Sequence, residues 1–313
     1  MNSDYFSGKK IWVTGHNGMV GSAIVRKLCS FSNAEILTVD KSVVDLESQE
    51  DTLAWVHTHR PDIIIHCAAK VGGIEANKNS PADFLSINLR IALNIIEAAV
   101  KFDVEKLVCL GSSCFYPKLS KQPISEEALL TGPLEPTNEA YALAKIATLK
   151  LCSYYREQYG RDFIGIVPTN LYGTGDNFNP NEGHVISALI HKFTYANANN
   201  VKQVDLWGSG KPLREFMHVD DAAEGILHLT KNYSLARHIN LCGGETVSIA
   251  RLASIIQGIV GYKGHVHFDL NKPDGMMKKS LDNTILSDFE WMPSIGLFDG
   301  LVRTIEEYKL RCR

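Results

Sequence analysis

The stretch at residues 9–23, KKIWVTGHNGMVGSA, decides the fold. Its first part is a short run of β-branched and aromatic residues, which predicts a strand, and the apolar residues that continue to Leu28 predict a helix. Between them, Gly15, Gly18 and Gly21 are spaced three apart. A strand, a glycine turn and a helix in this order are typical of a phosphate-binding turn for a dinucleotide, although the spacing is G-x-x-G-x-x-G rather than G-x-G-x-x-G. A plain tight turn is the alternative.

Further strands and helices alternate downstream of this turn. Strands are predicted at residues 35–39, 62–66 and 106–110, and helices at residues 84–101 and 139–159. Strands that alternate with helices indicate an α/β protein with a Rossmann-type, doubly wound parallel sheet. In such a sheet the ligand crevice lies at the carboxyl ends of the strands.

The alternation becomes less regular after residue 173. A loop rich in Asn, Gly and Pro is followed by expected elements at residues 185–198 (helix), 203–207 (strand), 220–230 (helix), 239–242 (strand), 247–260 (helix) and 266–268 (strand). We expect residues 1–170, rejoined by about 216–243, to form the dinucleotide-binding domain. Residues 171–215 and 244–313 would form a smaller C-terminal α/β substrate-binding domain.

Composition restricts the class of protein. With 313 residues, 45% of them hydrophobic and 21% charged, the chain has the composition of a soluble globular protein. Its net charge of −3 argues against general nucleic-acid binding. Seven irregularly spaced cysteines without Cys-x-x-Cys indicate reduced thiols. We see no signal peptide and no apolar run near the roughly 20 residues that span a bilayer. These features predict a cytoplasmic protein that binds neither nucleic acid nor membrane.

The second strand ends at an ambiguous pair, Asp40-Lys41. An acidic residue here can hydrogen-bond the adenosine ribose, whereas a basic one can bind a 2′-phosphate, so these residues leave the choice between NADH and NADPH open. Asp45 and Leu46 follow in a loop that could close over the adenine. Ala68-Ala69-Lys70, after the third strand, forms a turn whose small residues would allow a ligand to approach the backbone.

Tyr141 and Lys145 are four residues apart, so on the helix predicted at residues 139–159 they share one face. A lysine cation near a phenol lowers its pKa, and a tyrosine tuned in this way can donate a proton to a carbonyl oxygen. An isolated pair of this spacing is more often an ordinary surface pair. Its position after the glycine turn favours the catalytic interpretation.

Four further polar or aromatic sites are ambiguous on their own. Ser112-Ser113-Cys114 follows the fourth strand, where a serine could face the cofactor, but a lone cysteine is usually an inert small hydrophobe. His184 lies in a polar loop, where a solvated histidine is the default. His218-Val219-Asp220-Asp221 is interpreted as structural hydrogen bonding rather than a metal site. Trp207 could belong to the core, or stack on a base or sugar because a Gly-Ser-Gly loop follows it.

Taken together, these motifs resemble the extended short-chain dehydrogenase/reductases that act on nucleotide sugars. The resemblance runs from about Ile11 to KPDG at 272–275. It rests on the glycine turn and on AAKVGGI at 68–74, GSSCFYPK at 111–118, EPTNEAYALAKIA at 135–147, PTNLYG at 168–173, DNFNPNEGHV at 176–185 and WGSGKPLREFMHVDD at 207–221. It implies a homodimer that binds a GDP-sugar and NADP(H). The implied reaction converts GDP-4-keto-6-deoxy-D-mannose to GDP-L-fucose by 3,5-epimerisation and then reduction at C4.

The resemblance also implies residue roles. Ser112 would hydrogen-bond the C4 oxygen of the sugar, Tyr141 would protonate it, and Lys145 would hold the nicotinamide ribose and tune Tyr141. Cys114 and His184 would be the acid–base pair for epimerisation. The implied cofactor contacts are Gly15, His16, Asn17, Gly18, Met19, Val20, Gly21, Asp40, Lys41, Asp45, Leu46, Ala68, Ala69, Lys70, Leu110, Gly111, Tyr141, Lys145, Pro168, Asn170, Leu171 and His184. The implied substrate contacts are Ser112, Ser113, Cys114, Asn170, Lys192, Trp207, Arg214 and Lys279.

Two departures and three rival functions accompany the resemblance. Asn17 and Lys192 stand where some family members carry arginine. The rivals are another nucleotide-sugar epimerase or 4-reductase of the same family, a 4,6-dehydratase and a non-catalytic dinucleotide sensor. A sensor does not need the complete Ser112, Tyr141 and Lys145 set. A 4,6-dehydratase is disfavoured because Ser113-Cys114 stands where that class resembles an Asp-Glu pair.

Overall fold

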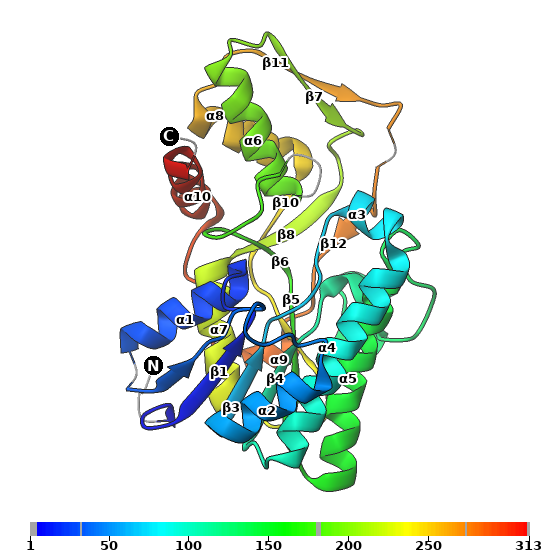
Figure 1. Ribbon diagram of the computed structural model, residues 1–313. Helices are drawn as coiled ribbons and strands as arrows, with labels where there is room; N and C mark the ends of the chain where they lie inside the picture. Colours follow the sequence, from blue (N-terminus) through cyan, green and yellow to red (C-terminus); the bar gives the residue numbers. More distant parts are fainter. Residues whose placement is uncertain (1–4, 32, 180–182, 273, 312–313) are drawn as a thin grey trace.

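The computed structural model describes residues 5–31, 33–179, 183–272 and 274–311. Its centre is a six-stranded sheet in the order β2-β1-β3-β4-β5-β9 (Figure 1). Every pair of neighbouring strands in it is parallel. The strands are β1 (Lys10–Thr14), β2 (Glu35–Leu37), β3 (Ile63–His66), β4 (Lys106–Leu110), β5 (Asp162–Pro168) and β9 (Ile239–Leu241). The predicted doubly wound sheet is therefore confirmed, with its change of direction between β1 and β3.

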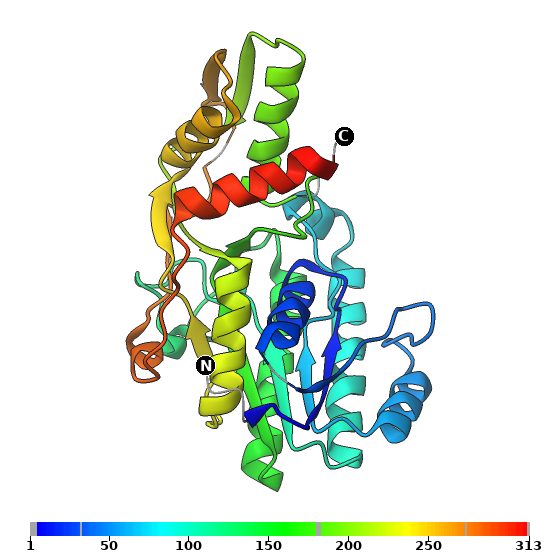
Figure 2. The ribbon, with the colours of Figure 1, turned by 90° about the vertical axis from the view of Figure 1, so that its left-hand side faces the viewer.

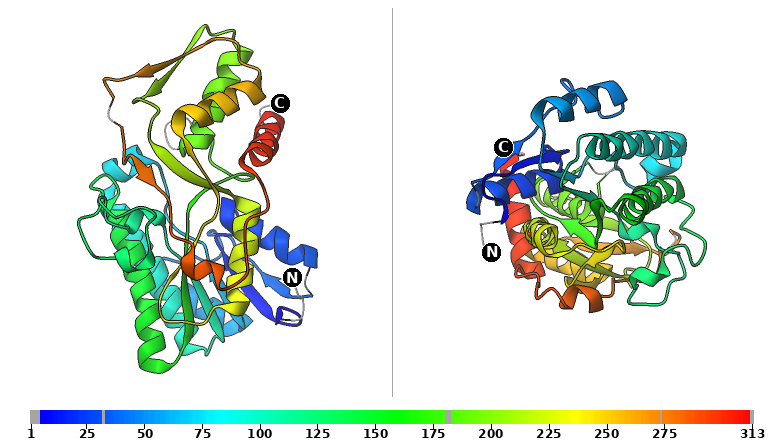
Figure 3. Two further views of the ribbon diagram at one scale, coloured as in Figure 1. Left: turned by 180° about the vertical axis from the view of Figure 1, so that it is seen from behind. Right: turned by 90° about the horizontal axis from the view of Figure 1, so that it is seen from below.

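Helices cover both faces of this sheet. On one side α1 (Met19–Phe31) packs against α7 (Val219–Asn232), and on the other α4 (Pro81–Lys101) packs against α5 (Glu139–Tyr159) and α2 (Gln49–His59). Seen from behind, α5 stands on the side away from α1 (Figure 3). Because both faces are covered, the central strands are apolar and fully buried, as the Ile-Ile-Ile-His run of β3 illustrates.

A second hydrophobic core lies beyond the carboxyl ends of the strands. It contains residues of α6 (Val185–Ala198), α8 (Ile249–Val260) and α10 (Leu297–Arg311), and Figure 2 shows α10 lying across the boundary between this part and the large sheet. Two small sheets accompany these helices. One pairs β7 (Gln203–Trp207) with β11 (His265–Asp269), and the other joins β6 (Asn170–Tyr172), β8 (Leu213–His218), β10 (Glu245–Ser248) and β12 (Lys278–Lys279).

Three details differ from the sequence expectations. Residues 247–248 end the strand β10 instead of starting a helix, because the Ser248 side chain caps α8 by accepting a hydrogen bond from the backbone N–H of Arg251 at 3.1 Å. The strand predicted at residues 35–39 ends at Leu37. Leu281, Leu286 and Trp291, in the segment expected in the substrate-binding domain, pack into the first core. The division into two domains stays a prediction.

Several elements had no counterpart in the prediction. These are α2, β6, β8, β10, β12, α10 and two short helices, α3 (Ile74–Asn79) and α9 (Thr284–Ser287), together with the 3-10 turns Ser113–Phe115 and Glu126–Ala128. Within the described ranges, no helix combines the length and the apolar character that crossing a membrane requires.

The carboxyl ends of β1 and β3 are joined by a buried polar contact. The Thr14 hydroxyl lies 2.8 Å from His66 Nδ1 and also accepts a hydrogen bond from the Ala68 backbone N–H at 3.2 Å. His66 is only 2% exposed. Burial, with a smaller effect from the Lys145 cation, lowers the pKa of His66 from 6.5 to about 3. The imidazole therefore stays neutral in the folded protein at neutral pH.

This buried histidine predicts a loss of stability in acid. Between pH 6.5 and about 3 the unfolded chain binds a proton at residue 66 that the folded chain does not, so the free energy of unfolding decreases as the pH falls. In His66→Asn, urea denaturation between pH 6.5 and 4 should show a dependence on pH that is shallower by about 1.4 kcal/mol per pH unit. An unchanged slope would contradict this assignment.

Candidate active site

One large cavity lies where the carboxyl ends of the sheet strands meet the second core. Its volume is about 1730 Å³. Gly15, Cys67, Gly111 and Pro168 line it from the ends of β1, β3, β4 and β5, and residues of α6, β7, β8, β12 and α8 line it from the opposite side. All the residues that the sequence analysis selected for cofactor, substrate or catalysis line this cavity.

The glycine turn forms one end of the cavity through contacts that only glycine permits. Gly15 has φ +68°, and a Cβ placed there would lie 2.8 Å from the Ala68 backbone. A Cβ on Gly21 would lie 2.3 Å from the carbonyl oxygen of Gly15. The Gly18 N–H donates to the same carbonyl at 3.0 Å, and α1 begins at Met19 with its free N–H groups at the cavity. This bare backbone and the helix N-terminus fit a dinucleotide pyrophosphate.

The residues after β2 form a charged pocket beside the turn. Asp40 accepts a hydrogen bond from the Asn17 side chain at 2.6 Å and lies 3.6 Å from His16 Nε2. The Lys41 ammonium donates to Glu47 at 3.1 Å, and this hydrogen bond, together with nearby Asp45, raises the pKa of Lys41. Asp40 is thus already hydrogen-bonded, while the Lys41 side chain is 74% exposed and can reach a ligand.

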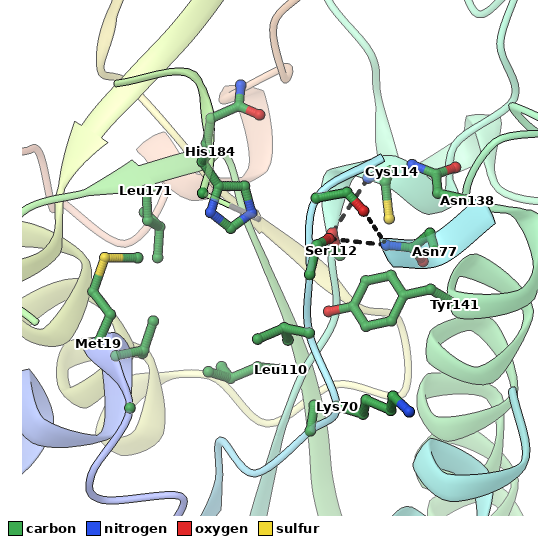
Figure 4. A pocket seen from close by; sticks show the side chains of 18 of the residues that line it. Met19, Lys70, Asn77, Leu110, Ser112, Cys114, Asn138, Tyr141, Leu171 and His184 are labelled. Atoms are coloured by element: carbon green, nitrogen blue, oxygen red, sulfur yellow. Dashed lines mark hydrogen bonds between the residues drawn. The ribbon is translucent and has the colours of Figure 1, made fainter. Parts of the chain in front are cut away.

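Ser112, Tyr141 and Lys145 lie together beneath the middle of the cavity. The buried Lys145 ammonium donates to the carbonyl oxygen of Leu110 at 2.9 Å and lies 5.8 Å from the centroid of the Tyr141 ring. The Ser112 side chain hydrogen-bonds Tyr141 and accepts from the Cys114 backbone N–H at 3.4 Å. In Figure 4 the Tyr141 hydroxyl points into the open space of the pocket.

The electrostatics of this group differ from the expectation. Burial raises the pKa of Tyr141, nearby Cys114 raises it further, and the Ser112 hydrogen bond opposes both. Burial also lowers the pKa of Lys145. The prediction that Lys145 lowers the pKa of Tyr141 is therefore wrong for this structure, because desolvation outweighs attraction and the ammonium is hydrogen-bonded to a backbone carbonyl. A buried phenol of raised pKa keeps its proton at neutral pH, as a proton donor must.

Cys114 and His184 approach the pocket from two sides. Cys114 lies in the turn after β4 and lines the cavity together with the buried cations of Lys145 and Lys279. His184 is the N-cap residue of α6 and comes from the second core; its side chain is 59% exposed. Figure 4 shows Ser112 between the two, with Tyr141 below it. A sugar ring held there would have a candidate acid or base on each side.

Cations cluster at the end of the cavity formed by the second core. Arg214 on β8 is directly opposite Lys279 on β12 in the parallel register, and Lys192 on α6 donates to the Asp205 carbonyl at 3.1 Å. Burial lowers the pKa of all three, which means that an anionic ligand would improve their environment. The Trp207 ring is 70% exposed. This set suits the diphosphate and base of a nucleotide.

Some lining residues were missed by the sequence analysis. Asn77 donates from Nδ2 to the carbonyls of Gly72 and Gly73 at 2.9 and 3.0 Å, and Asn138 lies beside Cys114 in Figure 4. The side-chain oxygen of each is buried with no hydrogen-bond partner among the described residues. Asn77 lies on the unpredicted helix α3. Asn138 could have been found, because it immediately precedes the helix predicted from residue 139, where asparagine is a common N-cap.

The His218-Val219-Asp220-Asp221 motif has the structural role that was predicted. His218 Nδ1 accepts from the Asp220 backbone N–H at 3.2 Å and so caps α7. Asp221 accepts from the Ser294 hydroxyl at 3.0 Å and from the Ile295 N–H at 2.8 Å. Over the part of the chain that the structure describes, no group of three or more His, Cys, Asp or Glu residues could hold a metal ion.

Comparisons with known proteins agree with this geometry. The model of the NAD dependent epimerase/dehydratase family matches residues 11–242. The chain is 50% identical to "Putative GDP-L-fucose synthase 2" of Arabidopsis thaliana, over 96% of this chain and 91% of that protein. It is 46% identical to "GDP-L-fucose synthase" of Escherichia coli, over 96% of each.

Solved structures extend the comparison to the fold and its ligands. A GDP-L-fucose synthetase from Naegleria fowleri bound to NADP superposes with a TM-score of 0.90 at 29% identity, covering 98% of this chain and 95% of that one. A GDP-mannoheptose C4 reductase from Campylobacter jejuni with NADP bound has a TM-score of 0.88 at 32% identity, covering 96% and 98%.

The glycine turn gives a direct test of the cofactor end. Gly21→Ala should weaken NADPH binding about tenfold or more, because the added Cβ forces the turn to move and overpacking of this kind costs about 1–3 kcal/mol. The matched control is Gly258→Ala on α8, where a Cβ would meet no atom within 4 Å. The dissociation constant is measured by titrating the fluorescence of NADPH. Equal affinities in both variants would exclude the turn as a cofactor contact.

Proposed function

The chain belongs to the NAD dependent epimerase/dehydratase family, and we propose that it is a GDP-L-fucose synthase, which converts GDP-4-keto-6-deoxy-D-mannose to GDP-L-fucose. The reaction consists of epimerisation at C3 and C5 followed by NADPH-dependent reduction at C4. Relatives of this name match nearly the whole chain. The observation that carries the proposal is that one cavity contains the glycine turn, the Ser112, Tyr141 and Lys145 group, and the Cys114 and His184 pair.

The cofactor is NADP(H), which the Gly15–Gly21 backbone would hold by its pyrophosphate. NADPH when bound supplies the hydride that reduces C4. At the adenosine end, Lys41 is the exposed cation available to a 2′-phosphate, and the Asn17 side chain occupies the neighbouring Asp40 carboxylate. The exposed Lys41 cation supports a preference for NADPH, whereas Asp40 keeps its negative charge in the hydrogen bond from the neutral Asn17 amide and would weaken that preference.

Epimerisation requires a base and an acid around a ketone. A proton on C3 or C5 is acidic because the electron pair that it leaves moves onto the C4 oxygen. We assign the base to Cys114, whose thiolate takes the proton and becomes a thiol. His184 then returns a proton to the same carbon from the other face. The hydroxyls of Ser112 and Tyr141 donate hydrogen bonds to the negatively charged C4 oxygen while the enolate exists.

Reduction uses the same pair of hydroxyls in a different way. The C4 oxygen needs a proton as the carbon is reduced. We assign the donation of this proton to Tyr141, which lines the cavity and whose buried phenol stays protonated. A hydrogen bond from the Ser112 hydroxyl would hold the C4 oxygen in place during this proton transfer. Lys145 uses one N–H on the Leu110 carbonyl, which leaves its other N–H groups for the nicotinamide ribose.

The GDP moiety is assigned to the cation-lined end of the cavity. Lys192, Arg214 and Lys279 would bind the diphosphate, and Trp207 would stack on the base or the sugar. Lys192 stands where some family members have arginine, so its contact would be a point charge rather than a bidentate fork. The six cysteines that the structure describes are all free thiols, which supports the proposed location in the reducing environment of the cytoplasm.

We also propose that the protein is a homodimer formed by α4 and α5. These helices pack side by side and expose apolar side chains, with Leu93 40%, Leu143 42% and Tyr154 50% exposed. A two-fold axis beside them would bury these residues against their copies. The proposed division into a dinucleotide-binding and a substrate-binding domain leaves this surface entirely on the first domain.

The dimer predicts a mass of two chains in sedimentation equilibrium at micromolar concentration. Leu143→Glu should produce monomers, because a charge at the centre of an apolar interface is costly to bury. Leu235→Glu is the control, since Leu235 is 55% exposed but lies outside both helices. A wild-type protein that sediments as a monomer, or a Leu143→Glu variant that stays dimeric, would contradict the arrangement.

The proposed reaction predicts that its two halves can be separated by mutation. Tyr141→Phe should slow NADPH-dependent reduction about 10²- to 10⁴-fold while NADPH still binds, because it removes the general acid. Cys114→Ser should lose the exchange of solvent deuterium at C3 and C5 of the keto sugar, measured by mass spectrometry without NADPH, yet keep hydride transfer. A panel of GDP- and UDP-keto sugars separates this function from those of other family members. Normal reduction by Tyr141→Phe would refute the assignment.

A further inference from the structure

The loop that carries His184 also buries a carboxylate that the proposed reaction does not use. The Asp176 side chain is 3% exposed, whereas the His184 side chain beside it is 59% exposed. Asp176 Oδ1 lies 3.9 Å from His184 Nδ1. His184 lines the cavity, whereas Asp176 is not among its lining residues.

The fold of the loop brings these two residues together and fixes the carboxylate. The Asp176 N–H donates to Gly173 at 3.2 Å, and its Oδ1 accepts from the Asn177 N–H at 2.8 Å. Gly183 lies close to the start of the loop, and its N–H donates to the carbonyl oxygen of Asn179 at 2.8 Å. A Cβ on Gly183 would lie 2.6 Å from the carbonyl oxygen of Asn177, so the close return needs glycine.

One oxygen of the carboxylate has an unsatisfied hydrogen-bonding capacity. Asp176 Oδ2 is buried and has no hydrogen-bond partner in the described part of the chain. Leaving a buried acceptor unpaired is unfavourable, and more so for a charged group. The main chain of His184 is held by hydrogen bonds from the Ala188 N–H at 2.9 Å and the Ser187 hydroxyl at 3.0 Å to its carbonyl oxygen. The ring can therefore turn toward Asp176 without moving the helix.

We propose that Asp176 is a positioning residue for epimerisation: it accepts the Nδ1–H of His184 and so directs Nε2 of the ring toward the sugar. This inference rests on the proposed function, in which His184 exchanges protons with C3 and C5. At 3.9 Å the contact is longer than a hydrogen bond, and hydrogen bonds of catalytic groups commonly tighten when the substrate is bound. A carboxylate on one ring nitrogen fixes both the tautomer and the orientation of an imidazole.

In this arrangement the two ring protons of His184 have different roles. The Nε2 proton moves to the substrate carbon, whose electron pair forms the new C–H bond. The Nδ1 proton stays between the ring and Asp176 throughout. His184 is then neutral, with Nε2 free to take a proton from water before the next turnover. Without the carboxylate, the ring could present either nitrogen or rotate out of line.

The test compares Asp176→Asn with the wild type in the deuterium exchange assay without NADPH. The substitution keeps the oxygen that accepts from Asn177 and removes the charge. We expect kcat for exchange to fall roughly ten- to hundredfold, a part of the 10²–10⁴ that general acid–base catalysis supplies. KM for the keto sugar and the affinity for NADPH should not change. Adding Asp176→Asn to His184→Asn should cost nothing more, because the carboxylate acts through the ring.

Asp221→Asn is the matched control, because Asp221 is a buried carboxylate that accepts from the Ser294 hydroxyl and the Ile295 N–H and is not among the residues lining the cavity. Its exchange rate should stay within about twofold of the wild type. Exchange at the wild-type rate in Asp176→Asn, or an additive loss in the double variant, would overturn the proposal. If the wild type exchanges no deuterium, the proposed function itself fails, which is a different result.

A second measurement does not depend on the variant folding. Nitrogen NMR of the wild type, with the His184 signals identified by their loss in His184→Asn, reports which ring nitrogen carries the proton. The Nδ1–H tautomer should dominate in the neutral ring when GDP is bound. A ring that is mostly protonated on Nε2, as in free histidine, would overturn the role of Asp176.

Discussion

The close backbone contact at the first glycine turn is the constraint on which the rest of the site depends. Gly21 sits against the Gly15 carbonyl, and Gly15 sits against the backbone after β3, at separations that leave no room for a side chain. This packing sets where α1 starts and how far β1 and β3 protrude at their carboxyl ends. The contact between the Thr14 hydroxyl and His66 Nδ1 also joins the carboxyl ends of β1 and β3. A dinucleotide site follows from these distances, because the same missing side chains expose backbone N–H groups to a ligand.

Burial rather than charge pairing governs the protonation of Tyr141 and Lys145, the proposed catalytic pair. Lys145 and Tyr141 have the helical spacing that suggests direct tuning, yet desolvation shifts both toward their neutral forms. The lysine is satisfied by the Leu110 carbonyl, a backbone group that no side-chain pattern reveals. For a general acid this has a clear benefit, since a phenol that holds its proton tightly is fully loaded at neutral pH. In the proposed reaction, the Tyr141 phenol becomes a better proton donor when negative charge develops on the C4 oxygen of the sugar. The proton then moves toward an anion in a site that excludes water.

Sequence periodicity predicted the helices and strands whose burial follows a regular pattern. The helices at 139–159 and 185–198 have their predicted bounds, because Gly160 stops the first and the polar loop before His184 precedes the second. The helix α2 was missed because among its residues only Thr52 and Val56 are buried, so it has almost no apolar stripe. The strands β8 (LREFMH) and β10 (ETVS) were missed because the charged residues Arg214, Glu215 and Glu245 interrupt the apolar pattern of these short segments. The candidate site residues were found through motifs, whereas Asn77 and Asp176 are distinguished only by burial and contacts that depend on the folded chain.

The proposed chemistry needs groups from both cores, so the placement of one core on the other determines the reaction. Cys114 lies in the turn after β4 and packs against the first core, whereas His184 is the N-cap residue of α6, which contributes to the second core. The span between them must match a sugar ring. A buried carboxylate, Glu215, braces the junction: it accepts N–H groups of Gly243 at 2.8 Å, Gly244 at 3.1 Å and Leu281 at 2.9 Å. These donors lie where the chain passes between the cores. If these hydrogen bonds hold the proposed base and acid at one separation, the sugar itself would have to reorient between proton exchange at C3 and at C5.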